Sequence, residues 1–256
     1  IGVPFYYASI SSFWIYMEAD PKVLRKLMKG TGLQPFISDK KGLVNLNFQS
    51  YSAHNGVPPV AATDEFEFNI IAYPESRKSD VPKMTHHCFM KGEDQTKLLG
   101  NYRVHVPCNN RFAIAAGKAL FGENKFYGDF SYKVPSPNLP SQKKWTYTIK
   151  DESGKMIINV DANFHHVVPE IANPAAIIDY STLNGKLIGS RRNIFSIINH
   201  YPLKRADAKN IKIKTGASTQ ANMAKDLAAV LKNSKIIATQ VIQTPPVIAE
   251  SRAYYP

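Results

Sequence analysis

The pattern of apolar and polar residues along the chain predicts a strand-rich protein. Neighbouring residues of a strand point to opposite faces, so apolar and polar residues that alternate indicate a strand with one buried face. Strands are predicted at 12–17, 43–51, 65–73, 101–107, 127–134, 145–150, 155–161 and 236–243, with two more extended segments within 185–214. The polar stretch from Pro74 to Lys97 is predicted to be a long loop or a hairpin excursion, and loops of that length in compact domains are often functional.

Three short helices are predicted among these strands. In the first, Asp20 caps the N-terminus, Pro21 takes the first helical position and Gly30 ends the turn. The second runs from Phe112 to Phe121. The third spans 219–232, with Thr219 as its cap. Its buried face is predicted to be Met223, Leu227, Val230 and Leu231, and its solvated face Lys225, Asp226 and Lys232.

No repeat and no shift in composition divides the chain. The predicted strands do not alternate with long helices, as they would in a parallel sheet. We therefore expect one domain over residues 1–256. Its predicted class is α+β, mainly β, with a large antiparallel sheet.

Composition excludes several classes of protein. A hydrophobic share of 44%, with 13 Phe and 13 Tyr, excludes a disordered chain. No apolar run is long enough to span a bilayer, so we expect a soluble protein that does not bind a membrane. The net charge of +12 is spread along the chain without any nucleic-acid-binding motif, so no nucleic-acid partner is expected. The chain begins at Ile1 rather than Met, which leaves N-terminal processing open, and no compartment is predicted.

The histidines and cysteines do not form a recognised metal or nucleophile motif. The pairs His86-His87 and His165-His166 lack the helical or Cys-x-x-Cys spacing of zinc ligands, so we expect no metal and no cofactor. Cys88 and Cys108 could form a disulfide only if their Cα atoms approach to about 6 Å, which the sequence leaves open.

Lys125 is the candidate for covalent chemistry. It follows an Ala-rich helix, and Phe121, Phe126, Tyr127 and Phe130 surround it in the sequence. Burial beside apolar rings favours the neutral amine of a lysine. A neutral amine condenses with a ketone to form an iminium, which accepts electrons from an adjacent breaking bond. The alternative is an ordinary surface lysine near a turn.

The segment NYRVHVPCNNRFAIAAGKALFGENKF, residues 101–126, resembles the core of the acetoacetate decarboxylase-like superfamily. The helix of that core matches 113–118, and Lys125 falls at the lysine that forms the family's Schiff base. Segments FWIYMEADPKVLRKLM and EFEFNIIAYPES, and residues 216–243, resemble other parts of the family. The resemblance covers most of the chain at low identity. It implies a curved antiparallel sheet closed into a barrel-like cone with short flanking helices, and a homo-oligomer.

The resemblance also assigns residues around the substrate, several of which depart from the family. Phe126 stands where the family has a second lysine, and Lys118 stands at the helix-end arginine. Ile10 takes the place of an arginine near the first strand. Asn69 takes that of a core-strand glutamate, with Glu67 on the same face of the predicted strand. Without the second lysine, desolvation would have to activate Lys125 alone.

The family's remaining acid falls in the polar stretch, where Glu93 is the candidate acid/base and Asp80 and Asp94 are alternatives. We therefore expect a carbon–carbon lyase that forms a Schiff base at Lys125 with a keto acid or related carbonyl compound. Decarboxylase and aldolase- or dehydratase-type chemistry both pass through that iminium. The alternative is a non-catalytic protein that binds a small ligand on the same fold.

Overall fold

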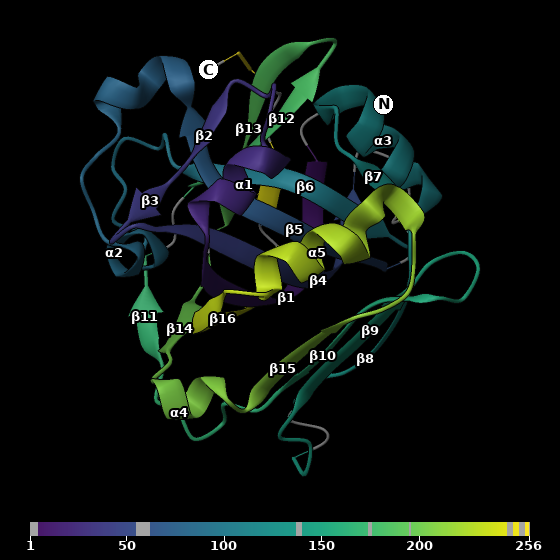
Figure 1. The fold of residues 1–256 in the computed structure, drawn as a ribbon. Coiled ribbons are helices and arrows are strands. Elements are labelled where there is room, and N and C mark those ends of the chain that lie inside the picture. Colours follow the sequence, from purple (N-terminus) through teal and green to yellow (C-terminus); the bar gives the residue numbers. More distant parts are fainter. Residues whose placement is uncertain are drawn as a thin grey trace.

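The computed structural model describes residues 5–54, 62–136, 140–173, 176–194, 196–244, 248–250 and 254–255 (Figure 1). Its strands are β1 (Phe5–Ala19), β2 (Leu33–Pro35), β3 (Ile37–Ser38), β4 (Lys41–His54), β5 (Thr63–Pro74), β6 (Gly100–Cys108), β7 (Lys125–Tyr127), β8 (Asp129–Lys133), β9 (Trp145–Lys150), β10 (Met156–Ala162), β11 (Glu170–Ala172), β12 (Ala176–Leu183), β13 (Lys186–Ile194), β14 (Ile198–Pro202), β15 (Ile211–Thr215), β16 (Lys235–Thr244) and β17 (Ile248–Glu250). Its helices are α1 (Pro21–Leu27), η1 (Glu75–Asp80), α2 (His86–Met90), α3 (Arg111–Phe121), α4 (Arg205–Ala208), η2 (Gln220–Asn222) and α5 (Met223–Leu231).

The strands form a 13-stranded sheet and a separate four-stranded sheet. The large sheet has the order β11-β14-β16-β1-β17-β13-β12-β6-β5-β4-β3, with β2 on β5 and β7 on β6. The small sheet has the order β15-β10-β9-β8. The large sheet is mixed rather than purely antiparallel, because β6 runs parallel to both β7 and β12. The mainly-β, α+β prediction is confirmed, and the prediction of an antiparallel sheet is corrected at β6.

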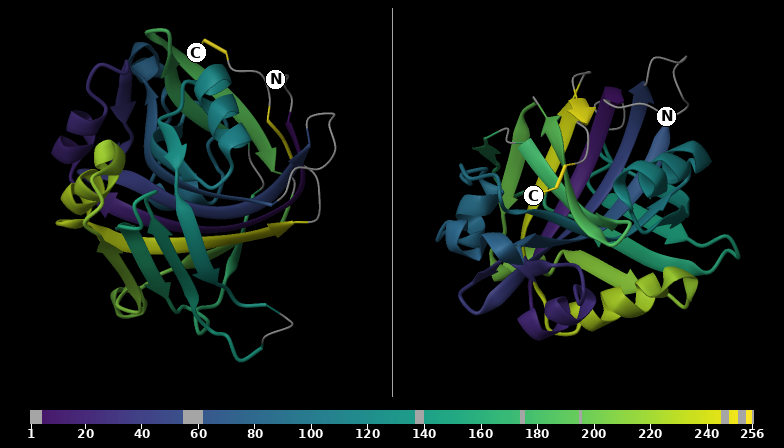
Figure 2. Two further views of the ribbon diagram at one scale, coloured as in Figure 1. Left: turned by 90° about the vertical axis from the view of Figure 1, so that its right-hand side faces the viewer. Right: turned by 90° about the horizontal axis from the view of Figure 1, so that it is seen from above.

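The long strands curve strongly. Following the pairings from each strand to its neighbour leads from β1 around the sheet and back to β1. Besides β16, strand β1 pairs with β4 and with β17, and β17 pairs with β13. The pairings β1–β4–β5–β6–β12–β13–β17 therefore form a circuit that leads back to β1. The left view of Figure 2 shows the long strands bending beneath α3 and the β12–β13 hairpin, with the small sheet on the other side. The large sheet thus has an inner and an outer face.

Each face of the large sheet buries its own set of side chains. The outer face packs against the small sheet, α1 and α5, and its aromatic rings stack there: Phe13 lies 5.1 Å from Trp145 and 6.2 Å from Phe48, between ring centroids. The inner face holds a second apolar cluster that includes Trp14 and Met90. Strands such as β4 and β5 are therefore buried on both sides.

The first two predicted helices form where capping residues begin and end them. Asp20 Oδ1 accepts a hydrogen bond from the Lys22 amide at 2.8 Å, which confirms the predicted cap of α1. Asn110 caps the N-terminus of α3. The helix ends at Gly122, whose φ of +61° lies in the left-handed region.

The C-terminal helix differs from its prediction at its start and on its polar face. It begins at Met223 after the short η2 turn, and the Thr219 side chain does not cap it. Met223, Leu227 and Val230 are buried and Leu231 is half-buried, as the apolar spacing predicts. Asp226 is half-buried rather than fully solvated, and it contacts His105 at 2.8 Å.

The polar stretch 74–97 is not one long loop, because it contains η1 and α2. Thr85 caps α2, which includes His86, His87 and Cys88. Cys88 and Cys108 are both free thiols, so the two cysteines do not pair. None of the helices in the described part of the chain is both long and apolar enough to span a bilayer.

Candidate functional site

A ladder of polar side chains lines the inner face of β4 and β5. The alternation of Phe66 and Phe68 with Glu65, Glu67 and Asn69 directs the phenyl rings outward and the polar groups inward. Strand register places Gln49 opposite Glu65, Asn47 opposite Glu67 and Asn45 opposite Asn69. All six polar residues of these pairs are buried, so a set of polar groups sits inside the protein.

Lys125 reaches this ladder from β7. Strand β7 runs parallel to β6, with Lys125 paired to Val106, because Gly122 turns the chain back after α3. Only 6% of Lys125 is exposed, and its Nζ lies 2.5 Å from Glu65 Oε2 and 3.4 Å from Glu123 Oε2. The lysine is buried as predicted, but it is surrounded by carboxylates rather than by a dry aromatic wall.

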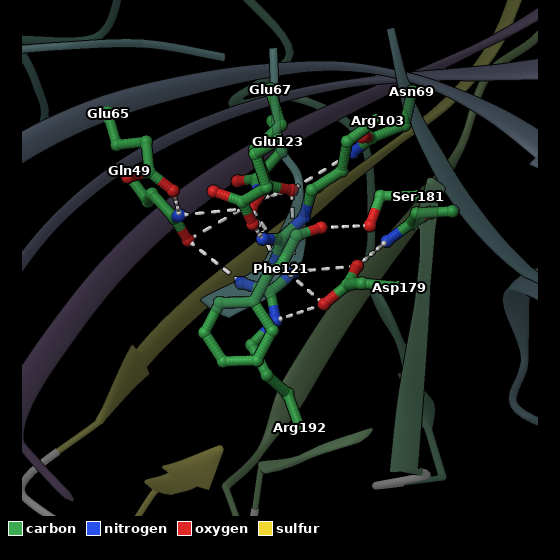
Figure 3. Close-up of polar contacts among 12 residues, drawn as sticks. Gln49, Glu65, Glu67, Asn69, Arg103, Phe121, Glu123, Asp179, Ser181 and Arg192 are labelled. Atoms are coloured by element: carbon green, nitrogen blue, oxygen red, sulfur yellow. Dashed lines mark hydrogen bonds and ion pairs between the residues drawn. The ribbon is translucent and has the colours of Figure 1, made fainter. Parts of the chain in front are cut away.

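Two buried arginines, Arg103 and Arg192, lie among buried carboxylates at this site (Figure 3). Arg103 of β6 contacts Glu67 Oε1 at 3.2 Å and Asp179 Oδ2 at 2.7 Å, and it also pairs with Glu123. Arg192 of β13 contacts Glu67 Oε1 at 3.3 Å and Asp179 Oδ2 at 2.9 Å. We refer to Lys125, Arg103, Arg192, Glu65, Glu67, Glu123 and Asp179 as the charged cluster.

The electrostatics of the charged cluster are clearest at Glu67. Burial by itself would raise the pKa of this carboxyl. The guanidinium groups of Arg103 and Arg192 and the hydrogen bonds from Asn69 and Asn47 outweigh burial and hold the pKa of Glu67 at about 2. Glu67 is therefore an anion that fixes both arginines.

Glu65 occupies a different environment. Its carboxylate accepts hydrogen bonds from the Tyr51 hydroxyl at 3.0 Å and from Gln49 Nε2 at 2.9 Å, and it accepts the 2.5 Å contact from Lys125. Burial and then the charge of Glu65 raise the pKa of Tyr51 well above its usual range and that of Cys108 to about 12. Tyr51 and Cys108 therefore stay protonated, and the Glu65 carboxylate is the group placed to exchange a proton with Lys125.

The structure brings together three of the residues expected at the site. Lys125, Glu67 and Asn69 all belong to the inner face, and Asn69 donates to Glu67 Oε2 at 3.0 Å. Ile10 is buried on β1 opposite Tyr51 in the strand register, among the apolar side chains of the inner face.

Phe126, Lys118 and Glu93 are found elsewhere. Phe126 points away from Lys125 and packs in the outer core, with its ring centroid 6.4 Å from that of His105. A lysine at position 126 would therefore enter the outer core and would not be a neighbour of Lys125. Lys118 is exposed on α3 and Glu93 is exposed after α2, with no described contact to the charged cluster.

The two alternative acids also lie apart from Lys125. Asp80 is exposed and pairs with Arg77 at 2.6 Å. Asp94 is buried but accepts hydrogen bonds from Thr96 and from the Leu99 amide, which fixes its own loop. The carboxylates beside Lys125 are instead Glu65 and Glu123, and neither was expected from the sequence. The signal for Glu65 was present in the EFEFN alternation, whereas the signal for Glu123 was not.

His86, in one of the two histidine pairs, makes local contacts. His86 Nδ1 lies 3.4 Å from Glu18 Oε1, and its ring packs against Phe36. Within the described ranges, no three His, Cys, Asp or Glu side chains are grouped closely enough to hold a metal ion.

Comparison with known proteins finds likeness in structure only. The sequence matches no family model and no curated protein. A structure of the enduracididine biosynthesis enzyme MppR complexed with pyruvate aligns with a TM-score of 0.68 at 11% identity, covering 99% of this chain and 90% of that one. An acetoacetate decarboxylase-like enzyme from Sphingomonas wittichii RW1 aligns with a TM-score of 0.62 at 12% identity, covering 100% of this chain and 92% of that one.

A structure of acetoacetate decarboxylase aligns as well, with a TM-score of 0.59 at 14% identity over 99% of this chain and 89% of that one. These similarities extend over nearly the full length of each protein, and they follow the curved mixed sheet with its few short helices. The chain therefore has the acetoacetate decarboxylase-like fold.

Proposed function

We propose that this protein is a carbon–carbon lyase that forms a Schiff base between Lys125 and a keto acid or a related carbonyl compound. The observation that carries the proposal is a buried lysine whose Nζ lies 2.5 Å from a buried carboxylate, Glu65 Oε2. A structural lysine has little reason to be buried at this depth, because burying an ion pair seldom increases stability. A lysine that must lose and regain a proton does need such a partner.

The chemistry follows from this pair. Proton transfer from Lys125 to Glu65 leaves a neutral amine that attacks the carbonyl carbon, and loss of water from the resulting adduct gives an iminium. The iminium draws the electron pair of an adjacent C–C or C–H bond onto the nitrogen. Decarboxylation, aldol cleavage and dehydration share this step. Glu123, whose Oε2 lies 3.4 Å from Lys125 Nζ, is a second group able to move a proton.

The structural neighbours support a carbonyl substrate. Solved structures of MppR hold it complexed with pyruvate and with the condensation product of pyruvate and imidazole 4-carboxaldehyde. The same class of substrate, a small 2-keto acid, would place its carbonyl carbon at Lys125 in this protein. The circuit of strand pairings through β17 further suggests the barrel-like closure that the resemblance implies, which would keep bulk water from the iminium.

The alternative, a binding protein without turnover, is favoured by one observation. Arg103 and Arg192 are each bridged to Glu67 and Asp179, so a substrate carboxylate would have to displace one of these acids. A neutral carbonyl ligand can bind without displacing either acid from the arginines. Assembly into a homo-oligomer, expected from the resemblance, stays a prediction that sedimentation can test.

Reductive trapping tests the proposal directly. The protein is incubated with pyruvate, acetoacetate or acetone, reduced with borohydride and digested for peptide mass mapping. We expect one adduct per chain on Lys125, lost in Lys125→Arg because a guanidinium cannot form the iminium. Lys118→Arg, at the exposed lysine of α3, is the matched control and should retain the adduct.

The outcomes separate the two functions. An adduct together with consumption of the carbonyl compound supports the lyase. Binding of a carbonyl compound to the wild-type protein, without adduct or turnover, supports the binding protein. An adduct that persists in Lys125→Arg would overturn the assignment of the lysine.

A further inference from the structure

The charged cluster contains more buried carboxylates than buried cations. Three cations face four carboxylates, and none of the seven side chains is more than 6% exposed. With every group ionised, the described side chains of the cluster therefore carry one negative charge in excess. This balance bears on which substrates can enter the site.

Every cation of the cluster already contacts at least two carboxylates. Lys125 has two, whose oxygens lie 2.5 Å and 3.4 Å from its Nζ. Arg103 has three and Arg192 has two, and Figure 3 shows both guanidinium groups among these acids. A ligand carboxylate would therefore meet cations whose charges are already balanced.

Amide donors of the inner face are also directed at the carboxylates of the cluster. Asn47 Nδ2 and Asn69 Nδ2 each donate to Glu67 Oε2 at 3.0 Å. Gln49 Nε2 donates to Glu65 Oε1 at 2.9 Å and to Glu67 Oε1 at 3.3 Å. These hydrogen bonds stabilise carboxylates of the protein itself, and an additional carboxylate would have to compete for them.

A neutral carbonyl compound leaves the charge of the site unchanged. The Lys125 ammonium and a ketone condense to an iminium and one molecule of water, and the positive charge passes from the ammonium to the iminium. Glu65 and Glu123 therefore face a cation before and after this step. A keto acid would bring a further negative charge into the interior, and a buried charge without a partner is costly.

We propose that the site selects neutral ketones or aldehydes and discriminates against keto acids. This inference rests on the function proposed for Lys125 and narrows its substrate class. A neutral substrate has no carboxylate to lose as carbon dioxide, so the reaction is an aldol-type cleavage or a dehydration rather than a decarboxylation.

Glu123 is placed to serve as the base in the aldol-type cleavage, since its Oε2 lies 3.4 Å from Lys125 Nζ. The hydroxyl proton of a β-hydroxy ketone passes to the Glu123 carboxylate, and the bond between the α and β carbons breaks. The electron pair of this bond forms the double bond of an enamine, and the π electrons of the iminium move onto its nitrogen. A free aldehyde or ketone leaves, and the enamine stays on Lys125.

Competitive trapping with acetoacetate and methyl acetoacetate tests the proposal. Both probes present a methyl ketone, but the first carries a carboxylate and the second a neutral ester. The protein is incubated with an equimolar mixture and reduced with borohydride, and the adducts on Lys125 are separated by mass. An isopropyl adduct, which acetoacetate would give after decarboxylation, is counted with acetoacetate.

The same mixture with butylamine gives the intrinsic ratio of the two probes. On Lys125 we expect the ester to exceed that ratio by at least about tenfold, because like charges brought together in a binding site are strongly disfavoured. The ester is the larger molecule, so its preference would not come from easier entry.

A variant of the cluster tests whether charge is the cause. Glu123→Gln removes the excess negative charge and should shift labelling toward acetoacetate by at least about threefold. The ratio compares two probes on one protein, so a general loss of reactivity does not affect it. Glu93→Gln, at an exposed glutamate with no described contact to the cluster, is the control and should keep the wild-type ratio.

The outcomes distinguish this inference from the function on which it rests. Labelling by acetoacetate at or above the butylamine ratio would overturn the neutral substrate class and leave the Schiff base in place. A wild-type ratio in Glu123→Gln would overturn the charge balance as the cause of selection. No adduct from either probe would overturn the proposed function and this inference together.

Discussion

Gly117 allows helix α3 to approach the charged cluster closely. A Cβ atom at this position would lie 2.7 Å from Lys125 Cδ and would overlap the carboxylate of Glu123. Glu123 is itself paired with Arg103, so its carboxylate cannot move aside without disturbing that pair. The absence of a side chain at Gly117 therefore determines where the Lys125 amine sits.

Gly117→Ala should consequently affect the site more than the fold. We expect Schiff-base formation at Lys125 to slow by at least about tenfold, because a misplacement of about 1 Å at a reacting group has large kinetic effects. The helix itself gains up to about 1 kcal/mol from Ala over Gly, which offsets part of the clash. The measurement is the rate of borohydride-stable adduct formation, read with thermal unfolding.

Ala119→Ser, on the exposed side of the same helix, is the control and should leave that rate unchanged. If Gly117→Ala also left the rate unchanged, then the position of Lys125 would not depend on this contact.

Single residues also show where the sequence was informative about the site. The alternation in 65–69 identifies Glu67 and Asn69 as members of one face, and Lys125 stands out by its resemblance to a family motif. Polar residues in alternation ordinarily indicate a solvated face, and here that face is buried. The partners Arg103 and Asp179 could not be found, because only the folded chain brings them within 2.7 Å across 76 residues of sequence.

At the level of elements, the predictions succeeded where local chemistry decides the structure. The cap at Asp20 and the apolar spacing of α5 are short-range signals, and both correspond to observed features. Helix α2 was missed because its five residues are too short to show a periodicity. The parallel pairings of β6 depend on the three-dimensional path of the chain and leave no local pattern.

Helix α5 offers a test of the outer core. Leu227 is fully buried against the core shared by the two sheets, so Leu227→Ala should lower the free energy of unfolding by about 2–5 kcal/mol. Lys225→Ala, on the exposed face of the same helix, should change it by less than about 0.5 kcal/mol. Urea denaturation measures both. A loss below about 0.5 kcal/mol in Leu227→Ala would show that this face does not carry the core.

For the whole molecule, the buried titratable groups predict that acid destabilises the fold. Burial, and then the nearby His87, lower the pKa of His200 from 6.5 to about 4. Between these two values the unfolded chain binds a proton that the folded chain does not, so stability falls as the pH drops from 6.5 to 4. Glu67, with its pKa held at about 2 against 4.5, extends the loss from pH 4.5 down to about 2.

His200→Gln should therefore reduce the fall in stability between pH 6.5 and 4, by up to about 3 kcal/mol over that window. His86 and His105, whose pKa values burial also lowers, keep part of the dependence. Urea denaturation at several pH values measures the slope, and the exposed His165→Gln is the control. An unchanged slope in His200→Gln would contradict the assignment.

The pairing of β1 with β16 also has a consequence for how the chain is made. These strands are far apart in sequence, since Tyr16 and Gln240 interact across 224 residues. At a synthesis rate of about 5–20 residues per second, roughly 10–50 s pass between the emergence of the two strands from the ribosome. During this interval β4 can cover one edge of β1, while the edge that β16 will occupy stays open. The aromatic segment of β1 therefore keeps one unpaired edge until β16 is made, and such an edge is able to pair with other chains.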